Sequence, residues 1–311
     1  MNLRKEIPIF LASDDNYMPF VAVTLHSIIE NASRDYDYAV KILHSGVSQD
    51  NVDKIMKYED ENFHIEFVDV KDLLSDVMER LHTRIYYTQT TYYRLFIASM
   101  YPQYDKILYI DCDVIVRGDI SKLYNIDIGD NLVGATTDQF VLNAPYLYPY
   151  VTKALGFSHV TDYFNAGVLI MNLDQFRKQN FEEKFCDLLS KYKFIVQDQD
   201  YLNILCKGQV KYISGMWDKM PCKEDSKLED IHLIHYNLIW KPWHAEIPYS
   251  DEFWKYVDKT EYKDHIRDIR ANFTEEAYQK KVNDFKGFMD VIVAEVDKPD
   301  NYFNLFVKQK A

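Results

Sequence analysis

The chain has 311 residues, of which 47% are hydrophobic and 27% are charged, the balance of an ordinary globular protein that can bury a large core. Its 49 acidic residues outnumber its 36 lysines and arginines, so the formal net charge is −13. Nucleic-acid binding needs clustered positive charge, and this balance excludes nucleic acid as a partner. An anionic ligand would instead need a local positive centre, such as a metal ion together with a lysine.

The cysteines and the apolar segments indicate the compartment. Four cysteines show neither C-x-x-C spacing nor the density of a disulfide scaffold. The apolar run at 7–12 is too short for a secretory signal, and no window approaches the roughly 18 apolar residues of a membrane span. The sequence therefore predicts a cytoplasmic protein.

Apolar runs alternate with helical periodicities along the first part of the chain. Strands are expected at 7–12, 39–43, 64–70 and 106–116. Helices are expected to begin near Pro19, to cover 52–58, to run from about Leu73 to Leu81, and to cover 90–100. This alternation predicts an α/β fold, a Rossmann-like and mostly parallel sheet with helices on both faces. Later strands are expected at 131–135, 166–173, 210–214 and 231–236, and later helices at 181–192 and 199–207.

From about residue 251 the pattern becomes helical and rich in charge. We therefore divide the chain into a main domain, residues 1–250, and a helical C-terminal extension, residues 251–311. An apolar stripe with helical spacing runs from Phe285 to Val296. We expect this stripe to pack on the main domain. A peripheral contact with the inner face of a membrane and a contact between subunits remain open alternatives.

Asp111 and Asp113 interrupt an apolar run that is typical of a buried strand. Residues i and i+2 of a strand point to the same side, about 6–7 Å apart. Carboxylates among apolar residues usually pair with a partner or bind a metal. The pair therefore suits one divalent cation that serves a diphosphate, and a solvated polar turn is the alternative.

The turn after the first strand, residues 13–18, carries carboxylates, an amide and a tyrosine. Neither G-x-G-x-x-G nor a P-loop occurs in the sequence, which excludes a dinucleotide-binding turn and a Walker ATPase. Ligands of parallel sheets bind at the carboxyl ends of strands, so this turn and the aspartate pair are expected to face one crevice. Its side chains suit a nucleoside, and capping of the next helix is the alternative.

Four further segments complete a pattern of six motifs: TTYYRL at 90–95, DYFNAGVLIMNL at 162–173, QDQDYLN at 197–203 and HYNLIWKPW at 235–243. With the first turn and the aspartate pair, they resemble glycosyltransferase family 8 in both identity and order. That family holds retaining transferases such as the bacterial lipo-oligosaccharide galactosyltransferases and the glycogenins. The resemblance runs from about Ile9 to Trp243 and implies a GT-A type fold, with the C-terminal extension outside it.

The resemblance implies a role for each matching residue. The uridine-binding turn is matched by Ala12, Asp14, Asn16 and Tyr17, with Tyr17 stacked on uracil. The D-x-D that binds Mn²⁺ and the donor ribose is matched by Asp111 and Asp113, with His235 as the third protein ligand of the metal. The lysine on the diphosphate is matched by Lys241, and the positions around the donor sugar by Arg94 and Asp138. The reacting centre is matched by Asn165, Asp198 and Gln199, with Gln199 beside the anomeric carbon.

The implied activity is a metal-dependent transfer of galactose or glucose from a UDP-sugar to a hydroxyl of a glycan, glycolipid or protein, with retained configuration. Two carboxylates and an imidazole favour Mn²⁺, with Mg²⁺ as the alternative. Attack on the face that the leaving group departs from is preferred to double displacement through Asp198 or Gln199. A nucleotide-sugar or glycan-binding protein with little turnover and a sugar nucleotidyltransferase remain as rivals. Leu238 stands where the family often has glycine, and a left-handed backbone there would be strained.

Overall fold

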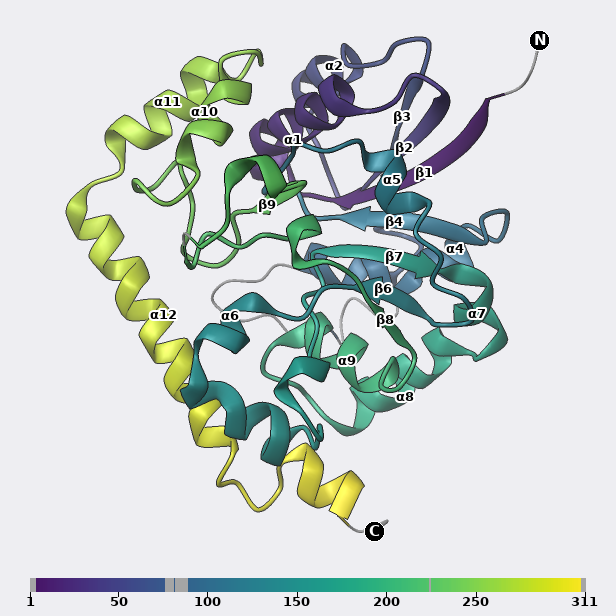
Figure 1. The fold of residues 1–311 in the computed structure, drawn as a ribbon, viewed down its shortest axis with the longest axis vertical. Helices are drawn as coiled ribbons and strands as arrows, with labels where there is room; N and C mark the ends of the chain where they lie inside the picture. Colours follow the sequence, from purple (N-terminus) through teal and green to yellow (C-terminus); the bar gives the residue numbers. More distant parts are fainter. Residues whose placement is uncertain (1–3, 76–80, 82–88, 224, 309–311) are drawn as a thin grey trace.

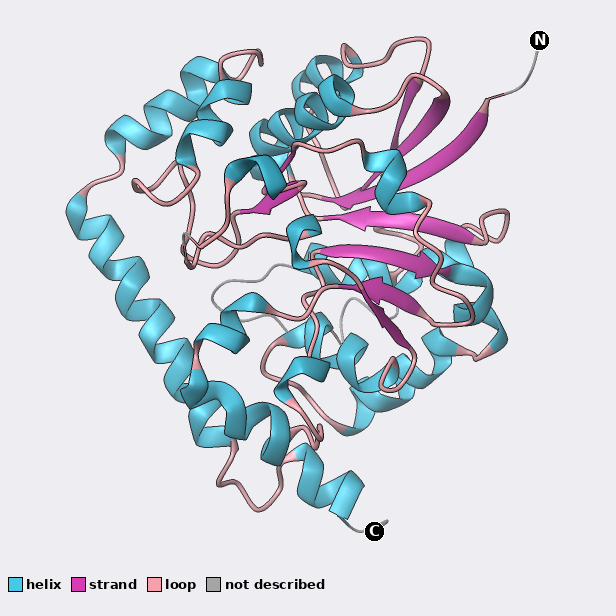
Figure 2. Ribbon diagram, viewed as in Figure 1, coloured by secondary structure: helices cyan, strands magenta, loops and turns pink. Residues whose placement is uncertain are grey.

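A computed structural model describes residues 4–75, 81, 89–223 and 225–308. A seven-stranded sheet with the order β3-β2-β1-β4-β7-β6-β8 runs through the middle of the molecule, and β5 pairs with β9 in a separate two-stranded sheet (Figures 1 and 2). The strands are β1 Lys5–Ala12, β2 Tyr36–His44, β3 Phe63–Asp69, β4 Lys106–Ile110, β5 Val114–Val116, β6 Val133–Ala135, β7 Val168–Asn172, β8 Val210–Tyr212 and β9 Leu233–His235.

Most neighbours in the large sheet are parallel. β1 pairs in parallel with β2 and β4, β2 with β3, and β6 with β8. β7 is antiparallel to both of its neighbours, β4 and β6. The predicted mostly parallel sheet is therefore confirmed, and the later strands are found close to the expected places, though shorter.

Helices cover both faces of the large sheet, as predicted. Side chains alternate along β1, so Phe10 joins the core cluster on one face while Ile9 and Leu11 join the cluster on the other. The Phe10 side is covered by the 3₁₀-helix η2 Gln89–Phe96 and by α4 Ile97–Met100, α7 Leu173–Lys178, α8 Phe181–Lys191 and α9 Gln197–Leu205. The other side is covered by α1 Met18–Asn31, α2 Gln49–Met56, α5 Ile120–Tyr124, α10 Ser250–Val257 and α11 Lys263–Asn272.

The prediction of one strand over 106–116 is wrong. β4 ends at Ile110, and the chain then passes into β5 of the other sheet, so Asp111 and Asp113 lie at the break between two strands. The side chain of Thr24 stabilises this break, because its hydroxyl donates to the carbonyls of Cys112 and Val114 at 3.0 and 2.9 Å. The polar residues mark the point where the chain leaves one sheet for the other.

The segment 90–100 is also different from the prediction, since most of it is the 3₁₀-helix η2 and only its end, α4, is α-helical. Arg94 Nε donates to the Thr91 carbonyl at 2.8 Å, and in an α-helix that carbonyl would accept from the backbone of Leu95. The helix predicted from Leu73 to Leu81 falls largely on residues outside the described ranges.

The C-terminal residues form a long helix, α12 Glu275–Glu295, which follows one edge of the molecule from α11 to the segments after α6 Gln139–Asn143 (Figure 1). Phe288, Met289 and Ile292 are buried in the core cluster of the Phe10 side. The expectation that the apolar stripe packs on the main domain is confirmed for these residues, while Val293 remains 41% exposed. Within the described ranges, none of the helices has the length and apolar character needed to span a bilayer.

Candidate functional site

A cavity of about 520 Å³ lies where β1 and β4 end, and α9, the segment after β9 and α12 also contribute to its walls. Every residue predicted for the site lines this cavity except Asn16. Asn16 is exposed on the first turn. The structure thus brings together motifs that lie more than 200 residues apart in the chain.

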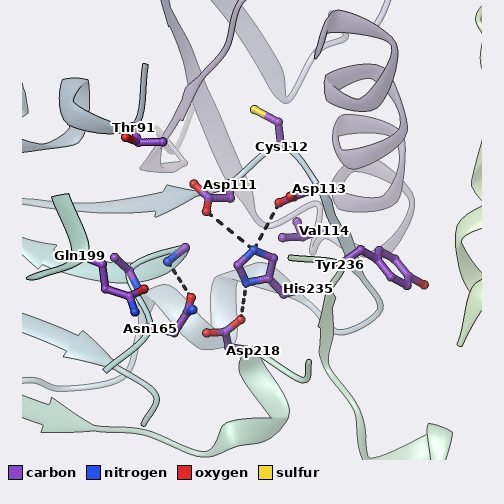
Figure 3. A network of polar contacts seen from close by, with 12 residues as sticks. Thr91, Asp111, Cys112, Asp113, Val114, Asn165, Gln199, Asp218, His235 and Tyr236 are labelled. Carbon is purple, nitrogen blue, oxygen red and sulfur yellow. Dashed lines mark hydrogen bonds and ion pairs between the residues drawn. The ribbon is translucent and has the colours of Figure 1, made fainter. Parts of the chain in front are cut away.

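Asp111, Asp113 and His235, which all line the cavity, point toward one another (Figure 3). The Nε2 atom of His235 lies 3.7 Å from Asp111 Oδ2 and 3.3 Å from Asp113 Oδ1, and the three candidate ligand atoms all lie within 4.8 Å of one another. Asp113 Oδ1 is buried without a hydrogen-bond partner among the described residues. Two carboxylate oxygens and an imidazole nitrogen at this spacing fit a divalent cation.

Each aspartate has one carboxylate oxygen facing His235, and its other oxygen accepts a hydrogen bond from a positively charged side chain. Arg94 Nη2 donates to Asp111 Oδ1 at 2.9 Å. Lys241 Nζ donates to Asp113 Oδ2 and also to the Tyr236 carbonyl, the latter at 2.6 Å. One oxygen of each carboxylate is therefore left that could hold a metal.

These charges shift the pKa values of the cluster. Burial alone would raise the pKa of Asp113, but Lys241 and His235 lower it below its usual range. Burial raises the pKa of Asp111, against the opposing effect of Arg94. Burial would lower the pKa of His235, but the carboxylates of Asp218 and Asp113 raise it to about 10. In the metal-free protein the imidazole therefore binds a proton where a metal would bind.

Asp218 orients His235 from the side away from the aspartate pair (Figure 3). Its Oδ1 lies 2.9 Å from His235 Nδ1, and its Oδ2 accepts a hydrogen bond from the Thr136 hydroxyl at 2.9 Å. Asp218 is fully buried. A carboxylate in this place fixes the ring and directs Nε2 to the metal position.

Gly167 leaves space for Asp111, Asp113 and His235, the triad of candidate metal ligands. A Cβ atom at this position would lie 2.3 Å from His235 Cε1 and 2.6 Å from Asp111 Oδ2. The Gly167 carbonyl also accepts from the Asp111 backbone N–H at 2.8 Å, so the strand end approaches the triad closely. Any side chain here would displace two of the candidate metal ligands.

The polar side chains beside the triad are linked through Asp138. Its Oδ2 accepts from Asn165 Nδ2 at 3.2 Å and from Gln199 Nε2 at 3.1 Å, while its Oδ1 caps α6 through the Val141 N–H. Gln199 Oε1 accepts from the Ala166 N–H at 3.0 Å. Both ends of the Gln199 amide are therefore engaged, and this amide is held as a rigid wall of the cavity.

Arg94 and Asp198, which also line the cavity, form a buried ion pair. Arg94 Nε lies 3.3 Å from Asp198 Oδ2, and the guanidinium stacks on the Tyr109 ring at 4.1 Å. Burial raises the pKa of Asp198 to about 6, although Arg94 opposes this. α9, which carries Asp198 and Gln199, is fixed to the chain before β7 because the Asn203 amide pairs with the backbone N–H and carbonyl of Phe164, each at 2.8 Å.

The first turn is placed as expected, with the capping alternative also realised. Asp14 accepts from the Tyr17 N–H at 3.1 Å and so caps the short helix there. The Tyr17 ring lies edge-on to Trp243, with centroids 6.2 Å apart, and lines the cavity. An aromatic ring at this wall is suited to stacking on a base.

Leu238 adopts a left-handed backbone with φ of 51°, which is one of the two possibilities left open by a leucine at a position where the family often has glycine, the other being a loop of different shape. It lies in the segment that joins His235 to Lys241 and lines the cavity. A non-glycine residue in this region costs on the order of 1 kcal/mol. The segment beside the triad is therefore strained.

Sequence reasoning missed Asp218, and it passed over Gly167 inside a motif that it did quote. A metal-bound histidine usually has a carboxylate partner, so some acidic residue was to be expected. No local pattern separates Asp218 from the other acidic residues of the chain. Tyr86 and Tyr87, which by the family resemblance fall near the acceptor side, lie outside the described ranges.

Comparisons with known proteins identify the family of the chain. The sequence model described as Glycosyl transferase family 8 matches residues 8–246. A Haemophilus influenzae protein named provisionally as a glycosyltransferase is 31% identical over 220 residues, 70% of this chain, and the match spans 64% of that relative's length. Lipopolysaccharide 1,2-glucosyltransferase of Escherichia coli K12 is 26% identical over 74% of this chain and 71% of its own length.

Solved structures of glycosyltransferases have the same fold. Galactosyltransferase LgtC, determined with donor and acceptor sugar analogues, is similar with a TM-score of 0.67 and 26% identity, over 82% of this chain and 96% of that chain. The bifunctional glycosyltransferase WbbM is similar in fold, with a TM-score of 0.75 and 24% identity over 86% of this chain and 52% of its own. The expected GT-A type fold is thereby confirmed, and the chain belongs to glycosyltransferase family 8.

Proposed function

We propose that the protein is a retaining glycosyltransferase that moves galactose or glucose from a UDP-sugar to an acceptor hydroxyl, with a divalent cation, Mn²⁺ in preference to Mg²⁺. The observation that carries the proposal is the convergence of Asp111, Asp113 and His235 in a cavity that Lys241 also lines. Family membership and the named activities of the relatives support it. They also favour a cell-surface glycan or glycolipid as the acceptor.

The breaking bond joins the anomeric carbon to the β-phosphate, and the electron pair leaves with UDP. A divalent cation bound at the triad supplies positive charge for this leaving group. Lys241, held by Asp113 and Tyr236, lies where it can donate to a phosphate oxygen. Its position beside the triad stabilises the charge that develops as the bond breaks.

Attack from the face of the departing phosphate accounts for retention best. Gln199 has its amide oxygen engaged by the Ala166 N–H, and Asp198 is paired with Arg94, so neither is free to attack the sugar. The acceptor oxygen forms the new bond, and its proton passes to an oxygen of the departing β-phosphate. Asp138, Asn165 and Gln199 hold the donor sugar in place for this step.

A panel of UDP-sugars with Mn²⁺, scored by release of UDP, tests the proposal. We expect release from UDP-galactose or UDP-glucose by the wild-type protein and no detectable release by the Asp113→Asn variant. Asp290→Asn, an exposed aspartate of α12, is the matched control and should behave as wild type. Normal release by Asp113→Asn would rule out the role of the triad.

A binding protein with little turnover is the second candidate, and the strained backbone at Leu238 favours it. Such a protein would bind UDP-galactose or UDP-glucose with Mn²⁺ and leave the donor intact. The same panel, followed by calorimetric titration of each donor, separates the two candidates. Binding without release, over long incubation and with glycan acceptors present, would favour this reading.

We also propose a cytoplasmic location, a peripheral contact with the inner face of the membrane, and a division of the chain into residues 1–250 and 251–311. They follow from the sequence patterns given above. Fractionation of cells that express the chain would test the first two, and limited proteolysis near residue 250 would test the third.

A further inference from the structure

α12 forms part of the cavity wall, although it lies outside the residues matched by the family. Lys281, Phe288 and Ile292 fall at positions i, i+7 and i+11 of this helix and all line the cavity. Positions with this spacing share one face of a helix. Phe288 and Ile292 are buried in the core and so fix the rotation of α12 about its axis, with Lys281 facing the cavity. Lys281 lies roughly 10 Å from Phe288 along the helix axis.

Positive charge gathers around Lys281 in an otherwise acidic chain. Burial and the neighbouring Lys241 lower the pKa of Lys281, while Asp284 raises it. The pKa of His244 is lowered to about 3 by burial and by Lys281, Lys241 and Arg270. His244 is therefore neutral at physiological pH, and its Nδ1 is buried without a hydrogen-bond partner among the described residues. A cavity wall with these groups suits an anion.

The charges of the triad show why a second lysine would be useful. Asp111 and Asp113 together offset the charge of a divalent cation, and Asp198 offsets that of Arg94, so the single charge of Lys241 is left. The negative charge of a sugar-nucleotide diphosphate, which increases as the sugar leaves, then faces little surplus positive charge. Lys281 and Lys241 line the same cavity, and the positive charge of Lys241 is felt at Lys281, whose pKa it lowers.

We propose that Lys281 is a second lysine for the donor diphosphate, so that α12 completes the donor site from outside the region shared with the family. This inference rests on the proposed function, because it assumes that the cavity binds a UDP-sugar. The charged group recognised is a phosphate. The donor is preferred to a phosphate on the acceptor because Lys241, next to Lys281, contacts the candidate metal ligand Asp113.

The test compares UDP with uridine, which lacks the diphosphate. Each is titrated by calorimetry, with Mn²⁺ present, into wild-type protein and into Lys281→Ala, Lys281→Arg and Lys280→Ala. Lys280 is the matched control, since it is the neighbouring lysine, is exposed and does not line the cavity. We expect Lys281→Ala to weaken UDP binding by about tenfold or more and to leave uridine binding unchanged. Lys281→Arg should recover most of the loss, and Lys280→Ala should match wild type.

The possible failures are distinct. If wild-type protein does not bind UDP, the proposed function fails. If wild-type protein binds UDP and Lys281→Ala binds it equally well, the inference alone is overturned. Equal weakening of UDP and uridine would show that the variant only displaces α12, which also overturns it. A changed KM for a phosphorylated acceptor, with UDP binding intact, would assign Lys281 to the acceptor and overturn the donor role.

Discussion

The two walls of the cavity obtain their polar groups in different ways. At the strand ends, each side chain is held by another: Asp111 by Arg94, Asp113 by Lys241, and His235 by Asp218. On α12, the wall is held by apolar packing of Phe288 and Ile292, and Lys281 extends from it. A change at the strand ends should therefore disturb several candidate metal ligands at once, whereas a change on the exposed face of α12 should leave those ligands in place.

The largest effect is expected at Gly167, where an added side chain would meet two candidate metal ligands. Gly167→Ala would place a methyl group 2.3 Å from His235 and 2.6 Å from Asp111, so both candidate ligands must move. We expect Mn²⁺ binding, measured by calorimetry, to weaken by at least about 100-fold and UDP release to fall with it. Wild-type affinity in this variant would show that Asp111 and His235 do not hold the metal.

Asp218→Asn tests the support behind His235 with little change in size. The amide cannot accept from the ring and the Thr136 hydroxyl as the carboxylate does, so the imidazole loses its orientation. We expect Mn²⁺ affinity to fall by about 10- to 100-fold. Thr136→Val, which removes only the outer hydrogen bond, should have a smaller effect, and an effect equal to that of Asp218→Asn would contradict this order.

The pH dependence of Mn²⁺ binding tests the raised pKa of His235. The metal needs the neutral ring, and in the metal-free protein the pKa of His235 is about 10. Each Mn²⁺ bound below this value must displace a proton, so affinity should rise as pH rises, by about tenfold per pH unit between pH 6.5 and 8.5. Calorimetry in buffers of different ionisation enthalpy would count the released proton. An affinity that does not change with pH would contradict the shift.

The smallest effect is expected on α12, where Gly287 lies in the helix interior. A Cβ added there meets no atom within 4 Å. Gly287→Ala should therefore raise the free energy of unfolding by about 0.5–1 kcal/mol, because alanine loses less conformational freedom in a helix. Urea unfolding measures this gain. Mn²⁺ binding should not change, and any loss of it would show that the two walls are coupled.

The same contrast shows how much the sequence alone could establish. Contiguous motifs with local chemistry were readable: the β1 turn, the aspartate pair and the His235 to Lys241 segment all line one cavity. The resemblance also marked Leu238 as a position where a left-handed backbone would be strained, and the structure has that backbone there. Strand positions followed from apolar runs, which report burial directly.

Features set by distant contacts could not be read in this way. At the change of sheet after Ile110, the backbone is bonded by the Thr24 hydroxyl, which lies far away in sequence. The choice of Asp218 as partner of His235 depends on a loop whose path has no local signature. The stripe on α12 predicted that the helix would pack, but periodicity does not say which element it meets or that Lys281 reaches the cavity.

The change of sheet after β4 has a consequence for stability. Asp111 follows the seven-stranded sheet, whereas Asp113 precedes β5 and His235 ends β9, both in the two-stranded sheet. A cation bound by all three would act as a non-covalent cross-link between the sheets. Since a ligand of the folded state adds its binding free energy to stability, the melting temperature of the protein would then report how fully the cation occupies its place.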